Sequence, residues 1–256
     1  MRDRVCIVSG ASRGIGRRLA LDLAREGARV ALVARPSAKL DEALAEVRAL
    51  GPACVGIGCD VRDPAGVRDM VAWVEASWGG VDVLINSAGI ETIASVADAS
   101  VEEIEQTIHT NVLGMVYCVK AVLPVMRRQR RGSIVNLSSS AAWFPLPRGA
   151  AYCASKAAII AFSESLYVEV HQEGIQVLVV YPGFVAETDM AQAHLRARGA
   201  PPRFVHQTLA QVSSAVRAAI GTEAVRVVLP RGLGWSLVVR DLFPTLSLRQ
   251  AARLQA

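Results

Sequence analysis

The sequence predicts an α/β protein built on a doubly wound parallel sheet of about seven strands in a single domain. Short apolar runs alternate along the chain with stretches of helical periodicity, which is typical of such sheets. The chain has 256 residues, of which 52% are hydrophobic, and this suits one domain with a large core. The sequence contains no linker, internal repeat or low-complexity tract that would divide it.

Seven apolar runs have the length of buried strands. The predicted strands span 4–9, 29–33, 53–58, 82–86, 133–138, 175–181 and 225–229. Helices are predicted between them, with long ones over 101–128 and 152–172. We expect residues 1–230 to form the main domain. Residues 231–256 are then a C-terminal extension that packs on this domain or on a partner subunit.

A Gly-rich turn follows the first predicted strand. It reads Ser9-Gly10-Ala11-Ser12-Arg13-Gly14-Ile15-Gly16, a helical pattern continues through Arg25, and Gly27 is expected to end that helix. Strand, Gly-rich turn, helix and strand form the context of a Rossmann-like dinucleotide site, although glycines also serve ordinary tight turns. Glycines let the backbone approach a pyrophosphate, and the helix N-terminus offers free N–H groups. The expected cofactor contacts in this turn are Gly10, Ser12, Arg13, Gly14, Ile15 and Gly16.

The end of the second predicted strand indicates which nucleotide binds. An acidic residue there would bind the ribose 2′-hydroxyl of NAD, but the chain reads Val33-Ala34-Arg35. The planar guanidinium of Arg35 suits a 2′-phosphate, and Arg13 adds a second charge. The sequence therefore favours NADP (NADPH) over NAD; two solvated surface arginines are the alternative interpretation.

Tyr152 and Lys156 are the candidate catalytic pair. The i, i+4 spacing places both side chains on one face of the predicted helix. Bringing a phenol from its usual pKa of about 10 to ~7 needs roughly 4 kcal/mol of preferential stabilisation of the phenolate. A cation ~4 Å away supplies that much at an effective dielectric of ~20. The pair alone also fits a core tyrosine beside a lysine whose ammonium reaches solvent.

Ser139 strengthens the catalytic interpretation. It lies in Ser138-Ser139-Ser140, where an apolar strand ends in hydroxyl groups that can hydrogen-bond a substrate oxygen. Turn formation is the alternative role of these serines.

These motifs together resemble the single-domain type of the short-chain dehydrogenase/reductase family, over about residues 3–230. Asp60-Val61 is similar to the family's adenine-contacting pair. Asn86-Ser87-Ala88-Gly89 is similar to its Asn-Asn-Ala-Gly turn, and Pro182-Gly183 to the turn after its sixth strand. Val185 and Thr188 then match the segment that contacts the nicotinamide carboxamide, with one extra residue before Thr188. The resemblance implies the cofactor contacts Asp60, Val61, Asn86, Ala88, Gly89, Tyr152, Lys156, Pro182, Gly183, Val185 and Thr188.

The same resemblance implies a catalytic tetrad with four roles, so we expect residues 1–230 to form a dinucleotide-binding and catalytic domain. Tyr152 exchanges a proton with the substrate oxygen, while hydride moves to or from the nicotinamide. Lys156 lowers the pKa of Tyr152 and holds the nicotinamide ribose. Ser139 orients the substrate carbonyl, and Asn111 holds a water that continues the proton relay. The family's usual Gly-rich C-terminal segment is replaced here, which argues against the common route to a tetramer; a homodimer or homotetramer is still expected.

Composition and charge limit the binding partners and the cellular location that the sequence predicts. The net charge is +5, but the dense basic cluster, Arg127–Arg131, falls at the end of a predicted helix and lacks interleaved aromatic residues, so no nucleic acid partner is expected. The four histidines are scattered, and no metal site is expected. Five scattered cysteines and the lack of a signal peptide or of an apolar run of about 18 residues predict a cytoplasmic protein. Peripheral membrane contact by the apolar tail is the less favoured alternative to packing.

The loops over 140–150 and 184–212 are expected to shape the substrate pocket, because they follow strand ends. Their apolar residues favour an apolar carbonyl or secondary alcohol, such as a 3-oxoacyl or steroid-like ketone. Trp143 and Phe144 fit either the pocket or ordinary packing. Three arginines fit either an anionic substrate tail or a solvated surface: Arg196, Arg198 and Arg203.

The sequence thus predicts an NADP(H)-dependent oxidoreductase that acts on a carbonyl/alcohol pair. A non-catalytic NADP-binding sensor or scaffold is the alternative from another class. An epimerase or dehydratase that recycles its cofactor is the alternative within the same chemistry.

Overall fold

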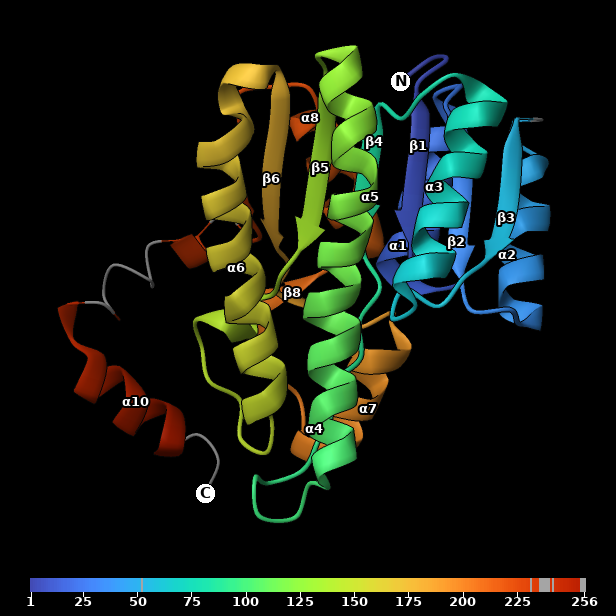
Figure 1. Cartoon of the computed structure of the whole chain (residues 1–256). Helices are drawn as coiled ribbons and strands as arrows, with labels where there is room; N and C mark the ends of the chain where they lie inside the picture. The colour runs from blue at the N-terminus through green and yellow to red at the C-terminus, as the bar shows by residue number, and fades with distance from the viewer. Residues whose placement is uncertain (52, 231, 235–239, 241, 254–256) are drawn as a thin grey trace.

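A parallel sheet of seven strands forms the middle layer of the molecule, with helices on both faces (Figure 1). The computed structural model describes residues 1–51, 53–230, 232–234, 240 and 242–253. The strand order is β3-β2-β1-β4-β5-β6-β9, and every neighbouring pair is parallel. The strands are β1 Val5–Ser9, β2 Arg29–Ala34, β3 Cys54–Gly58, β4 Val83–Asn86, β5 Gly132–Leu137, β6 Ile175–Tyr181 and β9 Arg226–Val228. The predicted doubly wound sheet is confirmed, and each strand ends within one residue of its predicted bounds.

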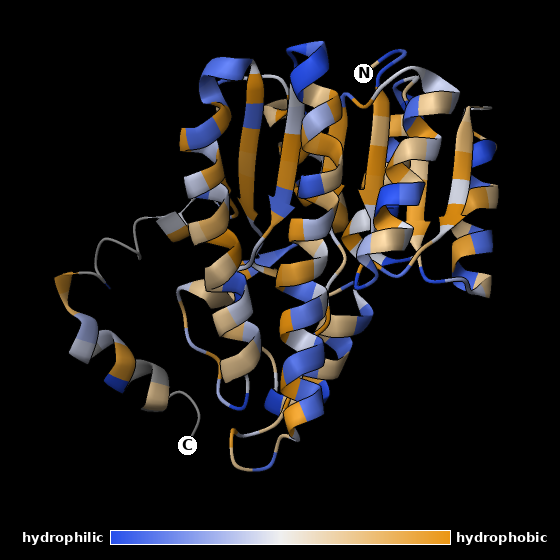
Figure 2. Cartoon of the chain, viewed as in Figure 1, coloured by the Kyte–Doolittle hydropathy of each residue, from blue (hydrophilic) through white to orange (hydrophobic). Residues whose placement is uncertain are grey.

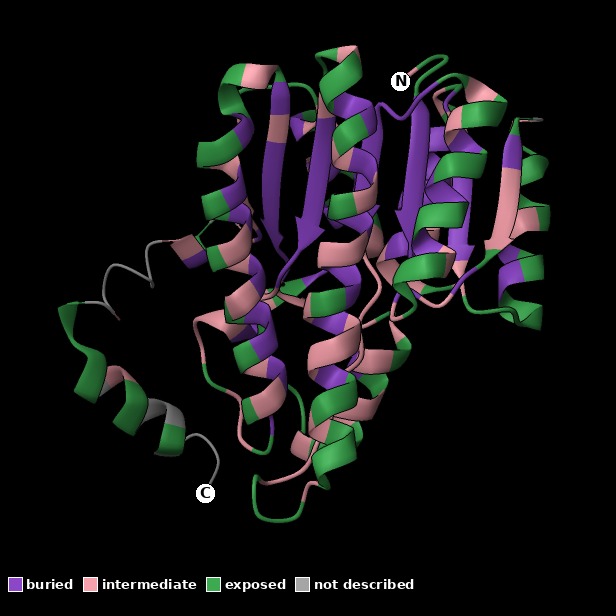
Figure 3. Cartoon of the chain, viewed as in Figure 1, coloured by how far each residue is buried: buried purple, intermediate pink, exposed green. Residues whose placement is uncertain are grey.

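Helices cover the two faces of the sheet in two groups. The helices are α1 Gly14–Arg25, α2 Ala38–Arg48, α3 Pro64–Trp78, α4 Val101–Ile108, α5 Gly114–Gln129, α6 Ala150–Val170, α7 Asp189–Arg198, α8 Leu209–Ala219 and α10 Pro244–Arg253. Buried side chains of α1, α2 and α8 pack on one face, and those of α3, α5 and α6 pack on the other. The central strands are mostly apolar and buried, while the edge strands β3 and β9 are partly exposed; the helices alternate between polar exposed and apolar buried sides (Figures 2 and 3).

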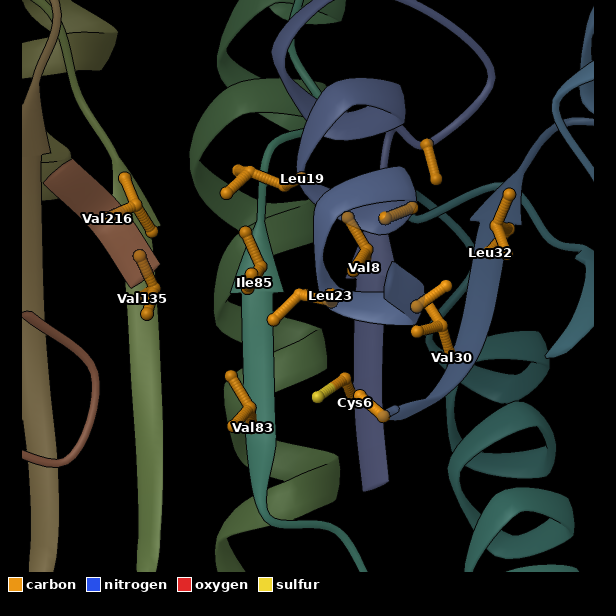
Figure 4. Close-up of a cluster of buried hydrophobic side chains, with 14 of the residues drawn as sticks. Cys6, Val8, Leu19, Leu23, Val30, Leu32, Val83, Ile85, Val135 and Val216 are labelled. Carbon is orange, nitrogen blue, oxygen red and sulfur yellow. The ribbon is translucent and has the colours of Figure 1, made fainter. Parts of the chain in front are cut away.

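Alternation along each strand divides the core between the two faces. Cys6 and Val8 of β1 belong to the cluster with α1, while Val5 and Ile7 belong to the cluster on the opposite face. Figure 4 shows the first cluster, where Leu19 and Leu23 of α1 lie over Val8, Ile85 and their neighbours. A strand buried on both faces needs apolar residues at every position, which explains why these strands stand out in the sequence as continuous apolar runs.

Two features differ from the sequence expectation. The helix predicted over 101–128 is interrupted by a π-helix, His109–Leu113, between α4 and α5. Two strands of two residues each, β7 Phe184–Val185 and β8 His206–Gln207, form a second small sheet. Neither was predicted, because a π-turn leaves the apolar spacing almost unchanged and a two-residue strand has no periodicity to detect.

Within the described residues, one helical stretch, Val101–Gln129, is long and apolar enough to cross a membrane by length and composition alone. Its α5 portion lies against the sheet, and Cys118, Val122 and Met126 of α5 are fully buried there. Buried core helices of soluble proteins meet the same two criteria, so this helical stretch gives only weak evidence for a membrane span.

The C-terminal segment ends in α10, which stands outside the three layers in Figure 1. Leu233 is buried, whereas Leu242, Phe243 and Leu248 are exposed. The predicted packing of the extension also depends on 235–239, and these positions lie outside the described residues. The division at residue 230 therefore stays a prediction.

The order of the strands creates the crevice in which a site is expected. From β1 the chain winds outward through β2 and β3, and then returns to the other side of β1 at β4. Loops that leave the carboxyl ends of β1 and β4 therefore diverge, and ligands of such sheets bind between them.

Candidate active site

The turn after β1 packs directly against the turn after β4. The Ser9 hydroxyl oxygen accepts hydrogen bonds from the backbone nitrogens of Ser87 and Ala88, at 3.2 and 3.3 Å. Gly10 has φ +68°, and a Cβ there would lie 2.7 Å from Ala88 Cα. A Cβ on Gly16 would lie 2.5 Å from the Gly10 carbonyl oxygen. Glycine is therefore required at both positions, and the turn leaves the N-terminus of α1 as a cradle that suits a pyrophosphate.

The remaining predicted residues of the turn lie at the start of α1. Arg13 is the N-cap residue of α1 and is exposed, while Gly14 is the first helical residue, with φ +58°. Ser12 is partly exposed, and Ile15 packs against the core, so its side chain supports the turn from beneath.

Cationic side chains gather where a nucleotide ribose would lie beside β2. Arg35 is exposed at the end of β2, and its charge lowers the pKa of Asp60 in addition to the larger effect of hydrogen bonds from Arg62. Lys39 and Arg13 both contact Asp189 Oδ2, at 3.0 and 2.9 Å, and hold the pKa of that carboxyl below its usual value. Lys39 was missed at the sequence level, because only the fold brings it to the carboxylate that Arg13 contacts.

Tyr152 and Lys156 lie on the first turns of α6, and both are buried. Lys156 Nζ is 5.6 Å from the centre of the Tyr152 ring and donates a hydrogen bond to the Leu137 carbonyl oxygen at 2.9 Å. Ser139 follows β5, and its hydroxyl oxygen accepts a hydrogen bond from the backbone nitrogen of Ala141 at 3.1 Å. That bond uses Ser139 as an acceptor, so its hydroxyl hydrogen is available for a further oxygen.

Burial and nearby charges set the acidities of the pair. Burial raises the pKa of Tyr152 well above its usual value and Glu91 raises it further, whereas Ser139 and Arg198 lower it. Burial lowers the pKa of Lys156 to about 8. Lys156 lies beside the phenol as predicted, but burial is the largest cause of both pKa shifts, and the pKa of Tyr152 is raised where a lowered pKa was expected.

Asn111 lies in the π-helix, and its side-chain amide hydrogen-bonds to two segments that are distant in the sequence. Its Oδ1 accepts from the backbone nitrogen of Ile90 at 2.8 Å, and its Nδ2 donates to the Ile90 carbonyl oxygen and to Ser155 Oγ, both at 2.9 Å. A Cβ on Gly89 would lie 3.3 Å from Asn111 Oδ1 and 3.6 Å from Lys156 Nζ. The loop after β4, the π-helix and α6 therefore meet at Gly89, and π-helical turns often mark functional sites.

The other predicted residues frame this centre. Asn86 Nδ2 donates to Asn136 Oδ1 across β4 and β5 at 2.8 Å. Val61 and Val185 are buried, and Gly183 approaches the Val205 carbonyl oxygen so closely that a Cβ would lie 2.4 Å from it. The Pro182 carbonyl oxygen accepts from the Ser140 nitrogen at 3.0 Å and so joins the turn after β6 to the loop after β5.

Thr188 caps α7, because its hydroxyl oxygen accepts a hydrogen bond from the Ala191 nitrogen at 3.1 Å. Its methyl carbon would lie 3.5 Å from a Cβ on Gly14. Thr188 therefore lies beside the Gly-rich turn despite the extra residue that precedes it.

Three functional candidates escaped the sequence analysis or were left open there. Glu91 and Arg198 form a buried ion pair with His194 beside it. Arg198 is therefore not a solvated residue, whereas Arg196 and Arg203 are exposed. No local signal distinguishes these three arginines, since their environments depend on where α7 packs.

Trp143 makes a packing contact, which is one of the two roles that the sequence left open. Its ring stacks on that of Tyr181, with centres 4.0 Å apart and planes 19° apart. Tyr181 is fully buried, so Trp143 anchors the loop after β5 to the end of β6.

Lys156 is expected to reduce stability at neutral pH. A pKa lowered from 10.5 to about 8 corresponds to roughly 3 kcal/mol. Below pH 8 the ammonium is charged in both the folded and unfolded states, so the folded state bears the full burial cost. This cost falls between pH 8 and 10.5, because Lys156 loses its proton in the folded state before it does so in the unfolded state. Above pH 10.5 the cost is absent.

Lys156→Met is therefore expected to raise the unfolding free energy at pH 7 by about 1–3 kcal/mol, after the lost hydrogen bond to Leu137 is subtracted. Urea unfolding at pH 7 and pH 10 measures the gain, which should shrink at the higher pH. Lys120→Met is the control, because Lys120 is exposed on α5. A Lys156→Met protein less stable than the unaltered chain at pH 7 would contradict the argument.

Comparison with known proteins identifies the class. The matching family model is that of the short chain dehydrogenases, over residues 4–199. The chain is 38% identical over 190 residues to a 3-oxoacyl-[acyl-carrier-protein] reductase of Bos taurus, covering 74% of this chain and 78% of that protein. A solved actinorhodin polyketide ketoreductase with NADPH has a TM-score of 0.84 and 30% identity, covering 91% of this chain and 99% of that one. An NAD⁺-bound xylitol dehydrogenase has a TM-score of 0.82 and 27% identity, and the match covers 89% of this chain and 98% of that one.

The chain belongs to the short-chain dehydrogenase/reductase family. It is an oxidoreductase with a nicotinamide cofactor, and its substrates are alcohols or carbonyl compounds.

Proposed function

We propose that the protein is an NADP(H)-dependent reductase or dehydrogenase of an apolar ketone or secondary alcohol, and that Tyr152 is its acid/base. The observation that carries the proposal is that Ser139 and Lys156 both lie against Tyr152. Lys156 Nζ also lies beside Gly89, in the loop that follows β4 and packs against the Gly-rich turn. A sensor needs only the cofactor cradle, whereas this arrangement adds groups suited to proton transfer.

The cradle fits a dinucleotide, because Gly10 and Gly16 let the turn fold closely against Ala88 and its own backbone and leave the N-terminus of α1 for a pyrophosphate. When bound, the nicotinamide supplies or accepts the hydride. In the reductive direction the Tyr152 hydroxyl donates its proton to the substrate oxygen, and in oxidation the phenolate takes a proton from the alcohol. The Ser139 hydroxyl donates a hydrogen bond to the same oxygen. Lys156 holds positive charge over the Tyr152 ring and so favours the phenolate.

Three cations support the choice of NADP. Arg35, Arg13 and Lys39 lie at the carboxyl edge beside β1 and β2, and no acidic residue ends β2. Similar solved structures carry NADPH or NAD⁺, so these side chains are the argument for the phosphorylated cofactor.

The Arg35→Asp variant is expected to weaken NADPH binding by about 10- to 100-fold, since a hydrogen bond between charged groups contributes about 1.5–3 kcal/mol. NADH binding should change little. Fluorescence titration with both cofactors measures the preference. Arg68→Asp on α3 makes the same charge change at an exposed position and should leave the preference for NADPH over NADH unaltered. An unchanged ratio of the two binding constants in the Arg35→Asp variant would reject the role of Arg35 in binding the 2′-phosphate.

The substrate class follows from the loops around Tyr152 and from the relatives. The loop after β5 carries Ala141, Ala142 and Phe144, and Phe184 follows β6. A 3-oxoacyl thioester is the first candidate, because one relative is named as a reductase of 3-oxoacyl groups and another as a polyketide ketoreductase.

The deciding experiment is NADPH oxidation across 3-oxoacyl thioesters, steroids, sugars and small aromatic ketones. Turnover of an apolar ketone is expected. Silence with every compound, with NADPH binding intact, would favour a sensor. Conversion of a substrate without net consumption of NADPH would indicate an epimerase or dehydratase.

A further inference from the structure

Arg198 is the most heavily bonded side chain at the rim of the site. It is the last residue of α7, and its side chain is only 5% exposed. Nε donates to the Pro147 carbonyl oxygen at 2.7 Å, and Nη2 donates to the Arg148 carbonyl oxygen at 2.9 Å. Nη1 lies 2.5 Å from Glu91 Oε1 and 2.9 Å from His194 Nδ1. One guanidinium thus joins three segments that are far apart in the sequence.

Each of these segments leads to the catalytic pair. Glu91 lies two residues beyond Gly89, in the loop after β4. Pro147 and Arg148 come just before α6, whose first turn carries Tyr152. A Cβ on Gly149 would lie 2.9 Å from Arg198 Nη2, so the guanidinium fits closely against the start of α6. Arg198 therefore holds α7 against both loops that flank Tyr152.

The same pair places opposite charges near Tyr152. Glu91 is 5% exposed, and a buried carboxylate needs a partner. Burial alone would raise the pKa of Glu91, but His194 and Arg198 hold it below its usual value. Glu91 raises the pKa of Tyr152, and Arg198 lowers it. Among the residues that the structure describes, Cys153 and Lys156 of α6 also face Tyr152.

We propose that Arg198 is a positioning residue, which fastens α7 and the loop before α6 to Glu91 and balances the charge of Glu91 beside Tyr152. The inference rests on the proposed role of Tyr152 as the acid/base. It predicts that the ion pair shapes the site mechanically and also sets the pH range in which Tyr152 works.

The electrostatic part is tested by the pH dependence of kcat/KM for alcohol oxidation, above the range in which carboxylates titrate. For alcohol oxidation, kcat/KM should rise with pH as Tyr152 loses its proton. Arg198→Met leaves the Glu91 carboxylate without its cation and should move the midpoint of this rise upward by about one pH unit, the change that one unpaired charge in partly buried surroundings produces. Glu91→Gln should move the midpoint downward. The double variant removes both charges and should return close to the wild-type midpoint. Equal midpoints in all four proteins, or a double variant as shifted as Arg198→Met, would overturn the proposal.

The mechanical part is tested without turnover, by amide hydrogen exchange of the full-length protein. Arg198→Met should speed exchange at least tenfold in 189–198 and 147–153. Arg196→Met removes an exposed arginine of the same helix and should leave exchange unchanged. Unaltered hydrogen exchange in the Arg198→Met variant would refute the fastening role, whether or not a substrate is found. Failure of the wild-type enzyme to turn over any ketone would instead reject the proposed function.

Discussion

Tyr152→Phe is expected to lower turnover by about 10²–10⁴-fold while NADPH binding persists, because a positioned general acid or base contributes that factor. Phenylalanine keeps the ring, which is buried and lies beneath Lys156, and removes only the hydroxyl. Steady-state kinetics with the best ketone of the substrate panel measures the loss. Fluorescence titration with NADPH shows whether the cofactor site is intact.

Tyr167→Phe is the matched control. Tyr167 lies on the same helix, α6, and stacks on His171 with ring centres 5.3 Å apart. Removal of its hydroxyl should leave turnover unchanged. Activity of the Tyr152 variant within tenfold of the wild type would mean that another group transfers the proton.

Gly10→Ala is expected to lower the unfolding free energy by about 3 kcal/mol and to weaken NADPH binding. The left-handed backbone contributes a penalty of ~1–2 kcal/mol for a residue with a Cβ. The new methyl would also lie 2.7 Å from Ala88 Cα and Ala88 N, and such overpacking costs about 1–3 kcal/mol more. Because backbone atoms oppose the methyl, the two turns must move apart.

Gly79→Ala separates the two contributions. Gly79 has φ +84°, but a Cβ there would meet nothing within 4 Å. This variant should lose only the conformational part, about 1 kcal/mol, and should bind NADPH normally. Urea unfolding of both variants measures the difference. Equal losses would show that the contact with Ala88 does not constrain the turn.

The candidate active site was only partly predictable from the sequence. The i, i+4 spacing of Tyr152 and Lys156 is a local property of a helix, and it correctly placed both on adjacent turns of α6. The acceptor of Lys156 is the Leu137 carbonyl oxygen, and Asn111 bonds to Ile90 and Ser155. These partners come from distant segments, so no local pattern identifies them.

Burial also changes the expected electrostatics. From the sequence, Lys156 is expected to have the largest effect on the pKa of Tyr152. In the folded chain, burial has the largest effect on the pKa of Tyr152, and Glu91 has the next largest. The dielectric around a side chain depends on all the elements that pack over it, and the spacing of two residues carries no such information.

The sequence by itself determined the sheet, the Gly-rich turn and the helical spacing of Tyr152 and Lys156. Each of these is encoded over a few neighbouring residues, as an apolar run, a backbone conformation that only glycine adopts readily, or a helical repeat. The tertiary structure alone decided which arginine is buried, where Lys39 and Asp189 meet, and that a π-helix places Asn111 against Ser155. Those features arise where chain segments far apart in the sequence converge at the carboxyl edge of the sheet, because close packing there selects partners by shape and charge.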